Sequence, residues 1–158
     1  MSTKFANNLN VTRTAFGAVS GLNSLASATY VALTALDLRT ITTTSQMPLD
    51  LLVELTITPG TVSGNKQAVL FCQVSLNNSV FTTGPTSGTT TTDQPDLFYI
   101  GSLPLNTNST QQVKVYSILA SIGFVPPAIK IVVLNDSGAA FGGSGNDCEY
   151  VVIAGDGT

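Results

Sequence analysis

Leu49-Asp50-Leu51-Leu52-Val53-Glu54-Leu55-Thr56-Ile57-Thr58 is the stretch of sequence that decides the fold. Its odd-numbered positions are all Leu, Val or Ile, whereas Asp, Glu and Thr occupy most of the even-numbered ones. Alternation with a period of two is typical of a strand that has one face on a hydrophobic core and the other in water. Pro59-Gly60 follows directly and predicts the end of this strand.

Further strand patterns, separated by turn residues, follow one another from residue 30 to the carboxyl end. No convincing helical pattern lies between them, and parallel strands need crossover connections of about a dozen residues or more, usually helical. The sequence therefore predicts an all-β domain over residues 29–158, an antiparallel two-sheet sandwich of the jelly-roll type. Besides 49–58, the expected strands span residues 30–38, 67–76, 80–82, 97–103, 111–122, 128–134 and 148–153.

The composition favours a protein that is covered by a partner. With 158 residues the chain is long enough for one domain with a real core, because a domain of this size buries about 70% of its unfolded surface. Only 9% of the residues are charged, against about 25% in average proteins. Ser, Thr, Asn and Gln therefore keep the surface hydrated, and such a surface costs little to desolvate.

Charge and hydropathy argue against two classes of partner. The six Lys and Arg residues are scattered singly and the net charge is −3, whereas nucleic-acid binding needs clustered cations. No stretch reaches the roughly 18 consecutive apolar residues of a membrane helix, and the first residues lack a secretory pattern. We therefore expect no nucleic-acid partner, no membrane partner and synthesis in a cytoplasm.

Residues 1–28 are rich in Ala, Ser and Asn, show weak periodicity and are interpreted as an N-terminal arm outside the sandwich. Apolar residues recur in this arm, and spaced apolar residues on an arm become ordered against a partner and add buried area. The alternative is that the arm folds back as an extra strand or packs over its own sandwich. The candidate partner-binding residues are Phe5, Leu9, Val11, Phe16, Val19 and Leu22, and Leu25 continues the pattern.

The sequence offers little for catalysis. The chain has no histidine, which removes the commonest general base and the commonest metal ligand. Asp50 and Glu54 share one face of the 49–58 strand, but four residues of strand place their backbones about 13 Å apart. The carboxyl groups of glycosidases lie only about 5–9.5 Å apart. We therefore expect a solvated strand face, no catalytic residue and no enzymatic activity.

Two loops carry weak signals for a cation. Asp93 and Asp96 flank Gln94-Pro95, and an Asp beside a Pro usually serves turn formation. The stretch Gly142-Gly143-Ser144-Gly145-Asn146-Asp147 resembles one copy of a Gly-rich calcium repeat, which binds calcium between stacked copies. We expect a hairpin loop at this second stretch, and neither a metal nor a cofactor in the protein.

The two cysteines, Cys72 and Cys148, are expected to be reduced, because thiols of a cytoplasmic chain are usually free and buried. Cys72 lies on the apolar face of the 67–76 strand together with Leu70 and Val74, so we expect it to be buried. A disulfide between the two cysteines is the less favoured alternative.

Four tyrosines raise the possibility of sugar binding, because aromatic rings stack on sugar rings. Trp, the best platform for such stacking, is absent, and tyrosines at sheet positions more often pack in the core or at its rim. The four residues are Tyr30, Tyr99, Tyr116 and Tyr150.

Four stretches resemble a known family. They are residues 48–67, which begin Pro-Leu-Asp-Leu-Leu-Val-Glu; residues 74–84, Val-Ser-Leu-Asn-Asn-Ser-Val-Phe-Thr-Thr-Gly; residues 103–109, Leu-Pro-Leu-Asn-Thr-Asn-Ser; and residues 131–140, Ile-Val-Val-Leu-Asn-Asp-Ser-Gly-Ala-Ala. Together they resemble the small jelly-roll capsid decoration (cement) proteins of tailed bacteriophages. The shared motifs are strands and turns, and they include no catalytic residue.

The resemblance implies a virion structural protein on the capsid exterior. Such a protein binds the major capsid protein, often as a homotrimer, and reinforces the shell after synthesis in the host cytoplasm. Similar turns occur in sugar-binding jelly rolls and in phage tail modules, so a carbohydrate-binding module on a phage appendage is the alternative. A hydrolase is disfavoured because histidine is absent and the carboxylate spacing is poor.

Overall fold

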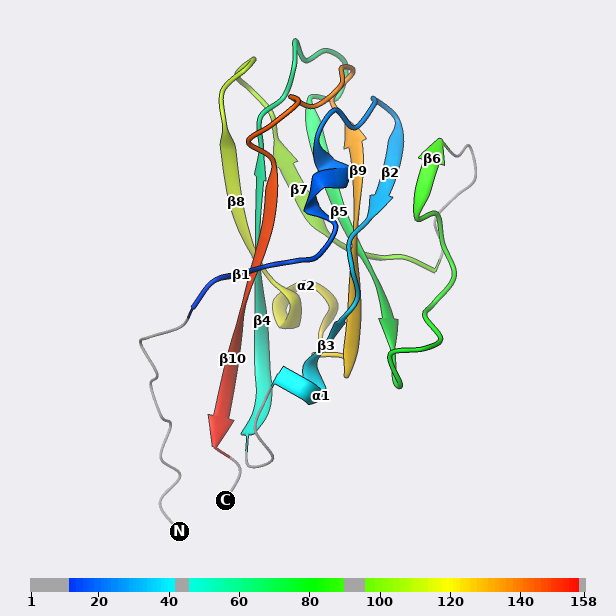
Figure 1. Ribbon diagram of the computed structural model, residues 1–158, viewed down its shortest axis with the longest axis vertical. Helices are drawn as coiled ribbons and strands as arrows, with labels where there is room; N and C mark the ends of the chain where they lie inside the picture. Colours follow the sequence, from blue (N-terminus) through cyan, green and yellow to red (C-terminus); the bar gives the residue numbers. More distant parts are fainter. Residues whose placement is uncertain (1–11, 42–45, 90–95, 157–158) are drawn as a thin grey trace.

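Strand β4 (Gln46–Ile57) is one of the two inner strands of a four-stranded antiparallel sheet. The computed structural model describes residues 12–41, 46–89 and 96–156. In this sheet β4 pairs with β10 (Asp147–Asp156) along one edge and with β8 (Gln112–Ser117) along the other. The short strand β1 (Thr14–Ala15) pairs with the far side of β10, which gives the order β1-β10-β4-β8 (Figure 1).

The second sheet has six strands in the order β6-β2-β9-β5-β7, with β3 also pairing with β9. Its pairings are antiparallel, and most connections between successive long strands cross from one sheet to the other, as in Greek-key sandwiches. The predicted all-β, antiparallel two-sheet sandwich is confirmed. The strands are β2 (Thr29–Ala32), β3 (Leu36–Asp37), β5 (Gln67–Ser75), β6 (Ser87–Thr89), β7 (Phe98–Pro104) and β9 (Ala128–Asp136).

The main core lies between the two sheets and follows the period-two patterns of the sequence. The odd-numbered residues of β4 from Leu51 to Ile57 are fully buried, as are Leu70 and Cys72 of β5 and Ile131 and Val133 of β9. Complete burial of a Leu or Ile side chain stabilises a fold by about 1.5–3 kcal/mol. The alternation therefore fixes which face of each strand points inward.

A second, smaller apolar cluster covers the outer face of the six-stranded sheet. It consists of Tyr30, Val69, Phe71, Leu97 and Val132. The segment that was expected to be a surface loop, 83–95, contains strand β6, which pairs with β2 at the edge of this sheet. Val69 and Phe71 of β5 pack in the outer cluster, which explains why β5 is apolar on both faces.

Two helices lie where strands were expected. The expected strand 30–38 divides into β2 and β3, followed by helix α1 (Leu38–Ile41). The expected strand 111–122 ends at Ser117, where helix α2 (Ile118–Ile122) begins. The expected strand 80–82 is irregular chain, held to β5 by the Thr82 N–H, which donates to the Val74 carbonyl. A further helical segment, the 3-10 helix η1 (Val19–Leu22), lies within the expected arm.

The prediction that residues 1–28 lie outside the sandwich is wrong for residues 12–28. Phe16 and Leu22 are buried in the main core, and Val19 and Leu25 pack against it. The ring centroid of Phe16 lies 4.9 Å from the ring centroid of Tyr150 on β10. Clustered apolar side chains bury more surface inside the sandwich than on a free arm, and this overrides the polar composition of the segment.

Backbone hydrogen bonds tie the same segment to the loops at the upper end of the sandwich in Figure 1. The Ala28 N–H donates to the Asn135 carbonyl at 2.7 Å, and the Phe141 N–H donates to the Leu25 carbonyl at 3.0 Å. The buried Asn135 side chain also donates to the Leu25 carbonyl. Residues 12–28 are therefore part of the domain, and the expected domain boundary at residue 29 is not a structural one.

Two valines of the four-stranded sheet test the assigned faces. Val53→Asp places an unpaired carboxylate in the main core and should lower the free energy of unfolding by about 3–5 kcal/mol. Val113→Asp makes the same change at a half-exposed position and should cost about 1 kcal/mol or less. Denaturant titration measures both, and equal losses would mean that the register of the sheet is wrong.

The placement of residues 12–28 predicts a specific effect of truncation. Deleting residues 1–28 removes Phe16 and Leu22 from the core and should leave a chain that melts at a much lower temperature or does not fold. Leu22→Ala alone should cost about 2–5 kcal/mol, whereas Leu76→Ala at an exposed position should stay within about 0.5 kcal/mol. A truncated chain that melts like the intact protein would contradict this placement.

Candidate interaction surface

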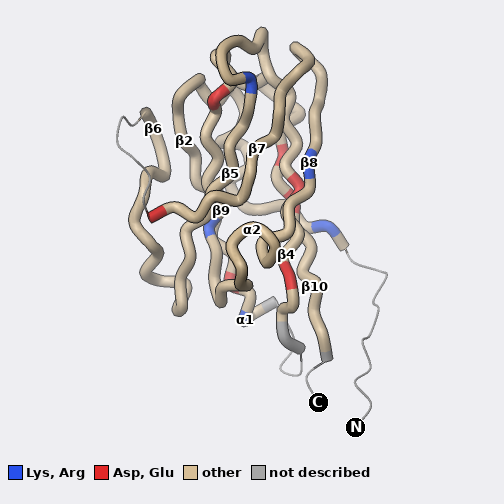
Figure 2. The backbone as a smooth tube through the Cα atoms, turned by 180° about the vertical axis from the view of Figure 1, so that it is seen from behind, with Lys and Arg blue, Asp and Glu red and all other residues tan. Residues whose placement is uncertain are grey.

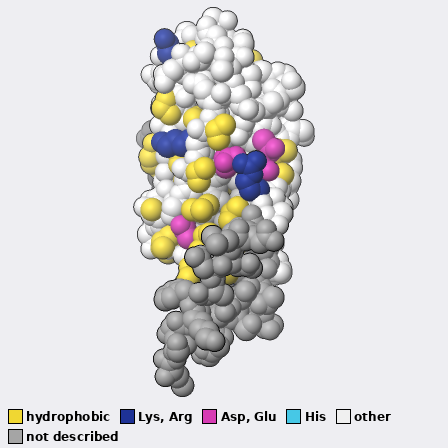
Figure 3. Space-filling model, turned by 90° about the vertical axis from the view of Figure 1, so that its left-hand side faces the viewer, with side chains coloured by type: hydrophobic (Ala, Val, Ile, Leu, Met, Phe, Trp, Pro, Cys, Tyr) yellow, Lys and Arg dark blue, Asp and Glu magenta, His cyan; other side chains and the backbone are white. Residues whose placement is uncertain are grey.

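The outward face of the four-stranded sheet carries apolar side chains from three of its strands. We define this four-strand face by Leu52, Val113, Val115, Val151 and Ile153. In the register of the sheet, Leu52 of β4 lies opposite Val151 of β10, and Val113 and Val115 come from β8. Val113 is 50% exposed and Val115 is 52% exposed. Figure 3 shows the corresponding side of the molecule, where apolar side chains surround one cluster of opposite charges.

That charged cluster consists of Arg13, Glu54 and Glu149. Glu54 and Glu149 lie directly opposite each other on β4 and β10, an arrangement in which two like charges repel. The Arg13 guanidinium bridges them, with Nη1 at 2.7 Å from Glu54 Oε1 and Nη2 at 3.0 Å from Glu149 Oε2. The single cation of Arg13 thus offsets one of the two carboxylate charges of this cluster.

This face was not recognised from the sequence. The sequence pattern of residues 111–122 places Val113, Val115, Ser117 and Leu119 on one face of the expected strand. In the structure Val113, Val115 and Leu119 are exposed, whereas Tyr116 and Ile118 are buried. The available signal was the apolar residue Leu52, which stands among the polar positions of the 49–58 stretch.

Asp50 and Glu54 do not form a carboxylate pair. Asp50 accepts hydrogen bonds from the Ser117 hydroxyl at 2.6 Å and from the Leu119 N–H at 2.9 Å. Ser117 in turn caps helix α2 by accepting from the Ala120 N–H. Asp50 therefore anchors the beginning of α2, whereas Glu54 binds Arg13, so the two carboxylates have separate structural partners.

The Gly-rich stretch 142–147 is part of the crossover from β9 in one sheet to β10 in the other, so the expected hairpin is wrong. Asn146 holds this crossover: its amide donates to the Asn23 side chain and to the Gly142 carbonyl. Its side-chain oxygen accepts from the Thr58 N–H at 2.9 Å. The polar atoms of Asn146 thus serve the loop itself.

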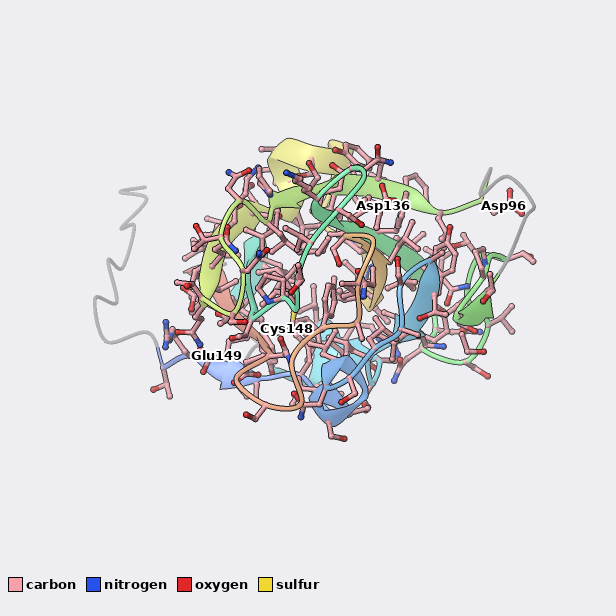
Figure 4. All side chains as sticks on the ribbon, turned by 90° about the horizontal axis from the view of Figure 1, so that it is seen from above. Asp96, Asp136, Cys148 and Glu149 are labelled. Carbon is pink, nitrogen blue, oxygen red and sulfur yellow. The ribbon has the colours of Figure 1, made fainter. Side chains whose placement is uncertain are left out.

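Asp and Glu residues occupy separate places along the backbone (Figure 2). In the view from above, Asp96 and Glu149 lie at opposite sides, and Asp136 is well separated from both (Figure 4). Within residues 12–41, 46–89 and 96–156, the structure brings together no group of three or more Cys, Asp and Glu side chains that could hold a metal ion. Asp96 is exposed, and Asp93 lies outside the described residues.

Both cysteines are buried and free, which confirms the prediction for Cys72. Burial raises the pKa of the Cys72 thiol to about 12. Burial also raises the pKa of the Cys148 thiol, and the negative charges of Asp147 and Glu149 raise it further. The thiolate is the reactive form of cysteine, so both thiols are expected to be unreactive at neutral pH.

The tyrosines do not form a platform for sugars. Tyr30 and Tyr116 are buried, and Tyr150 packs against the main core beside Phe16. Burial also raises the pKa of Tyr30 and of Tyr116. Only Tyr99 among the four is largely exposed, at 56%. Among the four tyrosines, only the ring of Tyr99 is therefore exposed enough to stack on a sugar.

An apolar groove of about 460 Å³ lies at the end of β5, on the other side of the sandwich from β10. The polar side chains at its wall are occupied locally: the Ser75 hydroxyl donates to Asn77, and the Thr82 hydroxyl accepts from the Val74 N–H. Asn77 also accepts from the N–H groups of its own turn. Apolar residues form most of the wall, namely Val74, Leu76, Val80, Phe81, Phe124, Pro126 and Pro127.

The candidate partner-binding residues of the expected arm separate into two groups. Phe16 and Leu22 are buried in their own domain and Val19 is half-buried, so these side chains are not free to bind a partner. Phe5, Leu9 and Val11 lie outside the described residues.

No helix within the described residues is long and apolar enough to span a membrane. Comparison with protein-family models finds no match, and comparison with curated proteins finds no matching sequence.

The buried thiols predict slow labelling of the native protein. Ellman's reagent at pH 8 should leave Cys72 and Cys148 unmodified on the timescale of minutes, and denaturation should release two reactive thiols per chain. Fast reaction of the folded protein would show that one of the thiols is accessible. A Cys72–Cys148 crosslink in non-reducing mass spectrometry would contradict the reduced state.

Proposed function

We propose that this chain is a structural protein of a bacteriophage virion, which binds the outside of the capsid through the four-strand face and stabilises the shell. The virion role is the one that the resemblance to capsid decoration proteins implies. The observation that carries the binding mode is the four-strand face itself, an exposed sheet surface with apolar side chains around a bridged charge cluster.

The chemistry of this face suits a stable contact. Apolar residues and Arg favour the buried centre of protein interfaces, whereas unpaired charges disfavour it because they must be desolvated. Val113, Val115 and Ile153 gain burial against a partner, and the Arg13 bridge lowers the cost of covering Glu54 and Glu149. The low overall content of charge, 9%, acts in the same direction.

A structural role also agrees with how the polar side chains are used. Asp50, Glu54, Asn135 and Asn146 each bind groups of their own domain, and the polar groups of the groove at the end of β5 are engaged in turns. A ligand or substrate site needs polar groups that converge on the ligand. The exposed ring of Tyr99 alone gives the carbohydrate-binding alternative little support.

The resemblance further implies trimers, and self-association is part of the proposal. Light scattering of the purified protein should give three times the chain mass of 16.3 kDa. The mass of one chain at micromolar concentration would remove the trimer from the proposal without affecting the capsid contact.

Substitution on the four-strand face tests the proposal. Val115→Asp places a charge in the proposed contact and should weaken binding to particles of the encoding phage at least about tenfold, because an unpaired interfacial charge costs 2 kcal/mol or more, roughly. Val80→Asp is the matched control: it makes the same change at a valine that is 73% exposed beside the groove.

Binding is measured by sedimentation of the labelled protein with gradient-purified particles stripped of the endogenous chain. The proposal expects Val80→Asp to bind as the unsubstituted protein does. If the chain does not copurify with particles, the virion role is wrong. If Val115→Asp binds with full affinity, the contact lies elsewhere on the molecule.

A further inference from the structure

The edge of β10 that faces away from β4 is only partly used. Strand β1 covers this edge at Glu149 and Tyr150 and then diverges. From Val151 to Asp156, β10 pairs with β4 on its inner side, and no strand within the described residues pairs with it on the outer side (Figure 1). An unpaired strand edge is a template for another extended chain.

The direction of the backbone groups identifies the free positions. The Phe16 N–H donates to the Cys148 carbonyl at 2.9 Å, so the backbone of Cys148 points to the outer edge. Alternate residues of a strand in an antiparallel sheet point their N–H and C=O groups to the same side. The backbone groups of Tyr150 and Val152 therefore also point outward, and those of Val151 point toward β4.

The composition of this edge makes it suitable for pairing. Residues 151–155, Val-Val-Ile-Ala-Gly, contain no charge and no proline, which are the usual devices that prevent strand addition. The opposite edge of the same sheet, formed by β8, carries a charged residue. Lys114 of β8 donates from Nζ to the Ser102 carbonyl of β7 at 2.9 Å. The pairing of β10 with β4 shifts register between Ile153 and Ala154. The regular part of the open edge is therefore residues 151–153.

We propose that the outer edge of β10 binds an extended, uncharged segment of the partner polypeptide as an additional antiparallel strand. The inference rests on the proposed function and names a second contact beside the four-strand face. The proposed direction is the one in which both described neighbours of β10, β1 and β4, pair with it. Apolar side chains at alternate positions of the added strand would extend the row formed by Val151 and Ile153.

Hydrogen exchange of single backbone amides tests the added strand. The intact protein is compared free and bound to particles of the encoding phage. The Val152 amide should exchange at least about tenfold more slowly in the bound state, because it gains a hydrogen bond. The Val151 amide is the internal control, since it pairs with β4 and should be protected in both states.

Two variants separate the backbone contact from side-chain effects. Val152→Pro removes the outward N–H while leaving the pairing with β4 in place, because proline is tolerated where the N–H of an edge strand points outward. Val152→Ala keeps the N–H but loses more side-chain packing than Val152→Pro does. With melting temperatures recorded for both, Val152→Pro should weaken particle binding about tenfold and Val152→Ala should not.

The outcomes distinguish this inference from the proposed function. Loss of binding in Val115→Asp without any change of the Val152 amide on binding would overturn the added strand and leave the capsid contact intact. The Val152 amide could also be protected in the free protein and lose this protection when residues 1–11 are deleted. That result would mean that the chain's own amino-terminal segment occupies the edge, and it also overturns the proposal. If Val152→Pro fails to fold, the amide measurement on the unsubstituted protein decides.

Discussion

Leu51, Val53, Leu55 and Ile57 of β4 are fully buried between the two sheets, and the arrangement of the other strands depends on this contact. β4 pairs with both β8 and β10, so the face that it buries sets the inward faces of these two strands through their register. A shift of one residue would place Asp50 and Glu54 in the core, which is the reason why a single register is stable. The six-stranded sheet supplies the opposite wall with Leu70, Cys72, Ile131 and Val133.

The same register determines what the molecule presents outward. Burial of the odd-numbered residues of β4 puts Leu52 and Glu54 on the exposed face, where β8 and β10 add Val113, Val115, Val151 and Glu149. The opposing carboxylates Glu54 and Glu149 then require a cation, and Arg13 provides it from the chain that leads into β1. The outward face of the four-stranded sheet is thus a direct consequence of how the core is formed.

Strands with strict alternation were predictable from the sequence, and segments whose structure depends on distant partners were not. The 49–58 pattern identified β4 because its period and its terminating Pro-Gly are local signals. Residues 12–28 have no such period, and their burial depends on Tyr150 and Asn135, more than a hundred residues away. The outward position of Val113 and Val115 was not predictable, because the strand contains apolar residues on both faces and only the pairing with β4 decides which face is buried. For the same reason the four-strand face could not be recognised from the sequence.

Cryo-electron microscopy of the decorated particle tests most directly the claim that the four-stranded sheet is the attachment face. We expect density for the sandwich on the outside of the shell, with Val113, Val115 and Ile153 directed at the capsid surface. Density in which the six-stranded sheet or the groove at the end of β5 faces the shell, while the four-stranded sheet points to solvent, would contradict it.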